Sequence, residues 1–203
     1  MATSPRRTAL TGGAALVVVD TETTGFARTD RVIEVALVRL SPTGAERARF
    51  STLLQPGCPL GSFTGHGITP AMLRDAPRFA EVAGELAHHL DGAVFVAHNE
   101  AFDRRMLGAE FARLAVEVDW GQPICTMHAA RRAFGVGSLR DACLAAGITQ
   151  RGAHTAFGDV ETTLDLLGAL TGLGALTPGA PLRVDGVGLE PGGWVLTRGG
   201  AGA

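Results

Sequence analysis

The sequence predicts an α/β fold with a mixed central β-sheet flanked by helices. Three strand segments come first in the chain, and short turns such as Pro42–Gly44 join them. Beyond them, short apolar strands alternate with segments whose apolar residues recur at helical spacing. Early strands with short connections, followed by alternating strands and helices, favour a mixed sheet with helices packed on it.

Each element is expected from its apolar pattern and its flanking residues. The first strand covers Ala14–Asp20, because the valine-rich run before Asp20 is short and bounded by glycines, as buried strands are. The helix that begins at Ala156 follows the helical recurrence of apolar residues through Leu170. The other expected elements are strands at Val32–Ser41, Ala45–Leu54, Ala93–Ala97 and near Ile124, with helices at Ala80–Leu90, Glu100–Leu114, near Ala129 and at Leu139–Ala146.

Length and composition are those of one globular domain with an appendage. The chain has 203 residues, of which 46% are hydrophobic and 19% charged, so it can bury a substantial core. We expect a flexible N-terminus at 1–13, a main domain at 14–177 and a glycine- and proline-rich tail at 178–203. Leu182–Val184 and Trp194–Leu196 could pair there as a small β-ribbon. We expect this tail to be dispensable for the activity of the main domain.

The N-terminus and the cysteines argue against export. Leu10–Gly13 contains threonine and glycine, which leaves no apolar stretch long enough for a signal peptide or a membrane-spanning helix. Cys58, Cys125 and Cys143 are odd in number and lack the spacing of zinc ligands. We expect them to be thiols in a reducing environment, so the predicted location is cytoplasmic, with no membrane partner.

Asp20 and Glu22 close the first strand, where alternate side chains share a face. Two carboxylates on one face of a core strand repel each other unless a cation lies between them. Oxygen ligands of this kind suit magnesium or manganese rather than zinc. A solvated acidic strand end is the alternative. Because the pair continues into Thr23, Thr24 and Gly25, where glycine lets the backbone approach a ligand, it is interpreted as half of a metal site.

A further acid, Asp103, follows the strand that ends at Ala97. In the segment His98–Asp103, Asn99 is a favourable N-cap and Glu100 opens the following helix. Asp103 then lies one turn into that helix, close to the end of the strand. Its alternative role is that of a simple partner for the helix dipole. Asn99 is the only asparagine of the chain, which hints at a specific need at this junction.

His154 and Asp159 flank the start of the last predicted helix. A helix holds a carboxylate rigidly, as a metal ligand requires, whereas a loop lets an imidazole move in and out of a site as a general base does. A lone histidine is more often a surface group or a satisfied core group. The other five histidines of the chain therefore receive no catalytic role from residue type alone.

These segments resemble the three motifs of the DEDDh-type 3′-to-5′ exonucleases, the superfamily of the proofreading epsilon subunit of bacterial DNA polymerase III. The matching motifs are Asp20-x-Glu22-Thr23-Thr24-Gly25, His98-Asn99-x-x-Phe102-Asp103 and His154-x-Ala156-x-x-Asp159. Three ordered motifs within roughly residues 14 to 172 make the resemblance specific. It implies a ribonuclease H-like fold, with 14–177 as the exonuclease domain. One departure is Gly61, where the epsilon subunit has a glutamate, so we expect nucleotide placement to differ on that side.

The resemblance also implies roles for the motif residues. Asp20, Glu22, Asp103 and Asp159 would be the ligands of two divalent cations, Mg²⁺ or Mn²⁺, with Asp103 acting partly through water. Such a pair of metals stabilises the attacking and leaving oxygens of an in-line displacement. His154 would take the proton from the attacking water. The expected products are nucleoside 5′-monophosphates, released one at a time from a free 3′ end.

Contacts to the substrate are implied at five residues. Thr23 and Gly25 would border the terminal sugar, and His66 would approach the terminal nucleotide. Asn99 and Phe102 would hold or stack the last bases, since aromatic stacking tolerates any base. A place in the helix core is the alternative for Phe102.

Single-stranded or frayed 3′ ends of DNA are the favoured substrate, in proofreading or repair, with a DNA polymerase as a candidate partner. A net charge of −2 and a pI near 6.3 argue against long, charge-driven binding of a duplex. An RNA-directed 3′-to-5′ exoribonuclease of the same superfamily is the first alternative, because preference for a sugar depends on contacts to the 2′-hydroxyl. A catalytically inactive nucleotide-binding module is the second, and the presence of all five catalytic residues argues against it.

Overall fold

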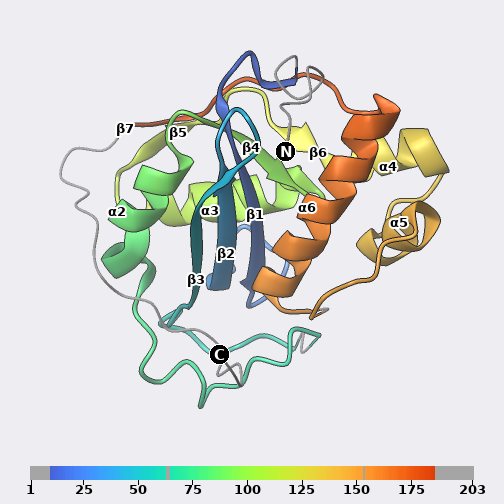
Figure 1. The fold of residues 1–203 in the computed structure, drawn as a ribbon. Coiled ribbons are helices and arrows are strands. Elements are labelled where there is room, and N and C mark those ends of the chain that lie inside the picture. Colours follow the sequence, from blue (N-terminus) through green and yellow to red (C-terminus); the bar gives the residue numbers. More distant parts are fainter. Residues whose placement is uncertain (1–9, 63–64, 153, 186–203) are drawn as a thin grey trace.

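The computed structural model of the chain describes residues 10–62, 65–152 and 154–185. Its centre is a five-stranded sheet in the order β3-β2-β1-β4-β6 (Figure 1). β2 pairs antiparallel with both β1 and β3, whereas β4 runs parallel to β1 and β6 parallel to β4. The predicted mixed sheet is therefore confirmed. Its strands are β1 Ala15–Thr23, β2 Val32–Leu40, β3 Glu46–Leu53, β4 Ala93–Ala97 and β6 Ile124–Cys125.

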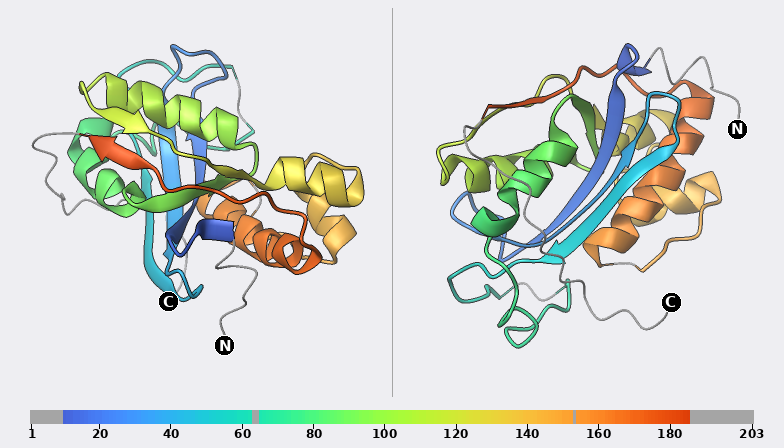
Figure 2. Two further views of the ribbon diagram at one scale, coloured as in Figure 1. Left: turned by 90° about the horizontal axis from the view of Figure 1, so that it is seen from above. Right: turned by 60° about the vertical axis from the view of Figure 1, so that its left-hand side comes forward.

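Helices cover both faces of this sheet (Figures 1 and 2). α2 (Phe79–Leu90) and α3 (Glu100–Ala112) pack on one face, and α6 (Ala156–Leu173) packs on the other. α4 (Thr126–Phe134) and α5 (Leu139–Ala146) lie beside α6. None of the helices in the described part of the chain combines the length and the apolar character that a membrane span requires.

β1 divides the core into two layers, because successive side chains of a strand point to opposite faces. Val17 and Val19 belong to the cluster formed with α2 and α3, while Leu16 and Val18 belong to the cluster formed with α6. The same alternation decides to which face the side chains of the later residues point. Asp20 and Glu22 face the side of α6, and Thr21 faces the side of α3.

β1 is longer than predicted. The expected strand ends at Asp20, whereas the pairing with β2 continues through Glu22 opposite Glu34 and Thr23 opposite Val32, with a shift in register between Glu22 and Thr23. The apolar pattern stops at the first carboxylate, but the backbone hydrogen bonds to β2 do not. Asp20 and Glu22 therefore lie within a paired strand, which fixes the direction of both side chains.

A second, two-stranded sheet is absent from the predicted elements. It pairs β5 (Glu117–Asp119) with β7 (Arg183–Asp185), whereas the partner expected for this part of the tail, residues 194–196, lies outside the described residues. Leu182, just before β7, is fully buried, and its N–H donates to the Ala93 carbonyl at 2.9 Å. The described part of the predicted tail thus packs against the domain, and the division at residue 177 stays a proposal.

Candidate active site

Three carboxylates meet where the end of β1 approaches the start of α6 (Figure 1). Asp20, Glu22 and Asp159 each offer an oxygen within 4.8 Å of the others, and all three side chains are half-buried. Asp159 lies in the first turn of α6, because the helix begins at Ala156 and is capped by Thr155, whose hydroxyl accepts a hydrogen bond from the Gly158 N–H at 3.1 Å. Two elements that are far apart in sequence thereby build one acidic cluster.

The acids of this cluster disfavour one another's charged forms. The pKa of Asp20 is held well above its ordinary value, first by burial and then by the surrounding carboxylates, Asp103 foremost. Burial also raises the pKa of Asp159, although the charge of His154 opposes the shift. A divalent cation would relieve this repulsion, and carboxylate oxygens suit the hard cations Mg²⁺ and Mn²⁺. The three acids are therefore able to hold a divalent cation.

Asp103 stands beside this cluster rather than in it. It lies on α3, is 3% exposed and accepts a hydrogen bond from the Thr21 hydroxyl at 2.8 Å. Because Thr21 points to the opposite face of β1 from Asp20 and Glu22, Asp103 approaches the strand from the other side. Burial raises the pKa of Asp103 to about 7, against the opposing effect of the Thr21 hydrogen bond.

His154 lies in the turn immediately before α6, and its side chain is exposed. Its φ is +67°, a left-handed conformation that is uncommon for residues other than glycine. Gly152 also has a positive φ, and the Thr155 hydroxyl donates to the Gly152 carbonyl at 2.8 Å, which closes the turn. The imidazole is thus open to solvent and close enough to Asp159 to affect its pKa.

His98, the other histidine within a motif, is unsuited to act as the base. Its Nδ1 lies 3.0 Å from the Thr126 hydroxyl and its Nε2 lies 3.0 Å from the Gly137 carbonyl. A carbonyl only accepts hydrogen bonds, so Nε2 donates to Gly137. Burial lowers the pKa of His98. With both ring nitrogens engaged, His98 ties the end of β4 to the helices that follow it.

Known proteins resemble the chain in sequence. The family described as RNase_T: Exonuclease matches residues 17–167. The chain belongs to this exonuclease family. The exonuclease domain is 38% identical to a DNA polymerase III subunit epsilon-like protein of Rhodobacter capsulatus, over 82% of this chain but only 25% of that protein. It is 34% identical to DNA polymerase III subunit epsilon of Treponema pallidum, over 75% of this chain and 74% of the relative.

Solved structures share the fold of the exonuclease domain. Cell-death related nuclease 4 matches with a TM-score of 0.68 and 16% identity, over 84% of this chain and 67% of that one. Escherichia coli exonuclease I in complex with an oligonucleotide matches with a TM-score of 0.65 and 19% identity, over 77% and 40% of the two chains. The ribonuclease H-like fold is confirmed by these structures, and the predicted class of enzyme is confirmed by the family.

An exposed phenylalanine missing from the predicted site follows the first motif of the exonuclease domain. Phe26 is 62% exposed, and its ring lies 6.0 Å from the ring of Phe102. Arg105 lies over the Phe102 ring at 5.3 Å and donates to the Phe26 carbonyl at 2.9 Å. The sequence feature that could have revealed this residue is its position directly after Gly25, which ends the first acidic motif. Together these side chains form a platform on which a base could stack.

The packing around the turn after β1 leaves no room for a side chain at Gly25 or Gly61. The Thr23 hydroxyl donates to the Gly25 carbonyl at 2.7 Å, so Thr23 stabilises its own turn. A Cβ on Gly25 would lie 2.6 Å from Asp30 Oδ2, and a Cβ on Gly61 would collide with the Thr24 carbonyl. Gly61 therefore has no room for the glutamate of the epsilon subunit unless the segment moves. A pocket of about 520 Å³ beside this turn is lined by Thr24, Gly25, Phe26, Asp30, Gly61 and Ser62.

Asn99 and His66 are the remaining residues expected to contact the substrate. Asn99 is the N-cap of α3, as predicted, but it has a φ of +74° and its side chain makes no capping hydrogen bond to the helix. Asparagine adopts this left-handed conformation more readily than most residues, which accounts for an asparagine at this junction. His66 is 2% exposed, and its Nδ1 accepts a hydrogen bond from the Ile68 N–H at 3.0 Å. Its approach to a nucleotide stays a prediction.

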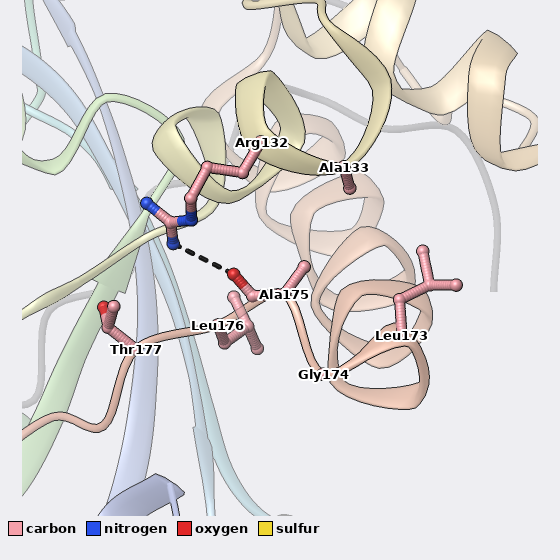
Figure 3. A pocket seen from close by; sticks show the side chains of 7 residues that line it. All are labelled: Arg132, Ala133, Leu173, Gly174, Ala175, Leu176 and Thr177. Carbon is pink, nitrogen blue, oxygen red and sulfur yellow. Dashed lines mark hydrogen bonds between the residues drawn. The ribbon is translucent and has the colours of Figure 1, made fainter.

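A separate hollow of about 510 Å³ lies at the opposite end of α6 (Figure 3). Arg132 donates there to the Ala175 carbonyl at 2.9 Å. Leu173 lies roughly 21 Å along the helix from Asp159, at about 1.5 Å per residue. The hollow is remote from the acidic cluster, and no carboxylate or imidazole is among its lining residues Arg132, Ala133, Leu173, Gly174, Ala175, Leu176 and Thr177.

Proposed function

We propose that the chain is a metal-dependent exonuclease that shortens single-stranded or frayed DNA from its 3′ end and releases nucleoside 5′-monophosphates. The observation that carries this proposal is the convergence of Asp20, Glu22 and Asp159, with His154 at the start of the same helix. DNA is the proposed substrate because relatives of 30% identity or more that the chain largely covers are named DNA polymerase III subunit epsilon.

Each acid has a defined part in the proposed site. Asp20, Glu22 and Asp159 would hold one Mg²⁺ or Mn²⁺, and Asp103 would help to hold a second through water, since it approaches from the other face of β1. Bound there, the cations supply charge stabilisation for the attacking and leaving oxygens. His154 takes a proton from the attacking water at a ring nitrogen, because a positioned imidazole can accept a proton and release it again within each turnover.

The side of the site that receives the substrate is proposed to be the turn after β1. Phe26 stacks on a terminal base, with Phe102 and Arg105 supporting it from behind. Thr23 and Gly25 shape the turn that borders the terminal sugar, and Asn99 and His66 remain proposed contacts to the last nucleotides. Stacking of this kind accepts any base, as a nuclease without sequence preference needs.

A DNA polymerase is proposed as a partner. The support is the name of the relatives, which are subunits of DNA polymerase III. A proofreading role would follow if the domain received frayed primer ends from that polymerase. Co-purification of the two proteins from the native source would test the association. Removal of a 3′ mismatch from a primer by the purified complex would test the proofreading role.

The activity itself is tested by digestion of oligonucleotides labelled at the 5′ end. Single-stranded DNA, a duplex with a mismatched primer end and single-stranded RNA of the same sequence are incubated with Mg²⁺ or Mn²⁺. We expect a ladder of DNA products shortened one nucleotide at a time from the 3′ end, and none in EDTA. Faster digestion of RNA would favour the exoribonuclease instead. Internal cuts or loss of the 5′ label would overturn the proposal.

A further inference from the structure

One buried carboxylate reaches the turn of His154 from the middle of the sheet. Glu34 lies on β2 directly opposite Glu22 of β1 and is only 2% exposed. Its Oε2 accepts a hydrogen bond from the N–H of Ala156 at 3.0 Å. Ala156 is the first residue of α6, two positions after His154 and three before Asp159. The sheet is therefore bonded to the backbone between the proposed base and a proposed metal ligand.

Burying a carboxylate at this position lowers the stability of the fold. Glu34 is buried among acids, and its charge contributes to the raised pKa values of Asp20 and Asp159, after burial and other charges. Replacing a buried ionic group by an apolar residue of similar size often stabilises a protein. The start of a helix offers partial compensation, since its N–H groups lack partners and its dipole favours a negative charge. Overall stability alone gives little reason for a carboxylate here.

The turn that Glu34 touches is under conformational strain. His154 has a φ of +67° and is not glycine, and such a conformation is unfavourable for a residue with a Cβ and persists only when the surroundings enforce it. Thr155 binds this turn from the helix side through the Gly152 carbonyl. Glu34 binds it from the sheet side through Ala156. These two hydrogen bonds flank His154 and oppose relaxation of its backbone.

We propose that Glu34 is a positioning residue for the exonuclease reaction, which holds the Ala156 amide and thereby keeps His154 at the acidic cluster. The inference rests on the proposed function, because it assigns the proton transfer to His154. Glu34 acts through the backbone of another residue and is neither a metal ligand nor the base. Its oxygen is needed as an acceptor, whereas its negative charge is not.

The test compares Glu34→Ala with Glu34→Gln, because the amide oxygen of glutamine can still accept from Ala156. We expect Glu34→Ala to lower kcat by about 10- to 100-fold, the usual effect of losing such a supporting hydrogen bond, with KM unchanged. Glu34→Gln should restore most of the rate. Glu85→Gln is the matched control, since it removes an acid of α2, on the opposite face of the sheet from α6, that pairs with His89. It should keep the parental rate.

A double-mutant cycle with His154→Ala decides whether Glu34 acts through His154. Residues that act as one unit give non-additive effects, so adding Glu34→Ala to His154→Ala should cause no further loss of kcat. Calorimetric titration with Mn²⁺ should give the same affinity for Glu34→Ala as for the parent. A multiplicative loss in the double variant, a loss of Mn²⁺ binding or a failure of Glu34→Gln to restore the rate would each overturn the inference.

A readout independent of activity separates this inference from the proposed function. Loss of a hydrogen bond to a charged group, worth about 1.5 to 3 kcal/mol, should speed amide hydrogen exchange at Ala156 by roughly tenfold or more. Glu34→Gln should show much less acceleration. If the parent protein fails to digest DNA, the proposed function is lost while the exchange rates still report on the hold over the turn. Unchanged hydrogen exchange at Ala156 in a folded Glu34→Ala protein would show that Glu34 does not stabilise the backbone of this turn.

Discussion

At its first residues β1 is flanked by apolar, closely packed side chains, whereas at its last residues it carries two carboxylates, Asp20 and Glu22, that meet a third, Asp159 of α6. Around the first end, Leu182 is fully buried, its N–H donates to the Ala93 carbonyl, and a Cβ on Gly179 would collide with Val94. Around the last end, Asp20, Asp103 and Asp159 have raised pKa values, and His154 adopts a left-handed backbone. The first end stabilises the fold. The last end holds mutually repelling carboxylates and a strained backbone, which cost stability and which the proposed reaction requires.

Because of this contrast, substitutions at the two ends of β1 should have different effects on activity and on stability. At the acidic end, removing a charged group relieves repulsion in the metal-free protein, so activity should fall without a loss of stability. At the apolar end, removing a side chain leaves a cavity, so stability should fall without a loss of activity per folded molecule. A variant that breaks this pattern would show that the two ends are coupled.

The largest effect is expected from Asp20→Ala at the acidic end. A metal supplies several kcal/mol of stabilisation to the transition state, so loss of a ligand should lower kcat by about 10³-fold or more. In EDTA the variant should melt at the same temperature as the parent or higher. Parental activity of Asp20→Ala at saturating Mg²⁺ would remove this residue from the metal site.

His154→Ala should lower kcat by about 10² to 10⁴-fold, the usual contribution of a positioned base. Mn²⁺ affinity, measured by calorimetry, should stay close to that of the parent, because the three acids of the cluster remain. Parental kcat in the variant would assign the proton transfer to another group.

Leu182→Ala should destabilise the protein by about 2 to 5 kcal/mol, as buried leucine truncations do. Chemical denaturation measures the change, and kcat per folded molecule should match that of the parent. For the same reason, a chain that ends at Thr177 should be less stable than the parent, whereas its exonuclease activity per folded molecule should stay within a few-fold, as expected from the sequence. Loss of cleavage in a folded, shortened chain would contradict that expectation.

Phe26→Ala should weaken binding of single-stranded DNA by about 1 to 3 kcal/mol, the value of one stacked base. The change should appear as a higher KM with little effect on kcat. Leu144→Ala is the control, because Leu144 is 78% exposed on α5, outside the proposed site. Equal KM values for the two variants would refute the stacking role.

The stability of the metal-free protein should depend on pH through Asp103. Its pKa is about 7 in the folded protein, against roughly 3.9 in an unfolded chain. The folded state therefore binds more protons between these values, and stability should fall as pH rises from about 4 to about 7 and then level off. Saturating Mg²⁺ should restore stability at pH 8, and Asp103→Asn should flatten the slope. A rise in metal-free stability across this window would contradict the assignment.

Local patterns were sufficient to predict most elements and the candidate residues. The valine run before Asp20 and the helical spacing after Ala156 depend on side chains close in sequence, so periodicity could reveal them. The end of β1 could not be read this way, because pairing with β2 extends the strand beyond its apolar part. Asn99 was correctly placed as the N-cap of α3, but its left-handed backbone could not be read from residue type, because asparagine favours both N-caps and left-handed backbone.

By itself the sequence predicted the mixed sheet from local spacing and the class of the enzyme from the resemblance of its three motifs, and it named the candidate acids and histidine, because such motifs depend on residue type and order along the chain. Only the tertiary structure decided how they are grouped. The bond from Thr21 to Asp103 joins residues 82 positions apart and sets that acid beside the cluster. The bond from Ala156 to Glu34 spans 122 positions. Such contacts follow from how the helices pack on the two faces of β1, and no local propensity encodes that packing.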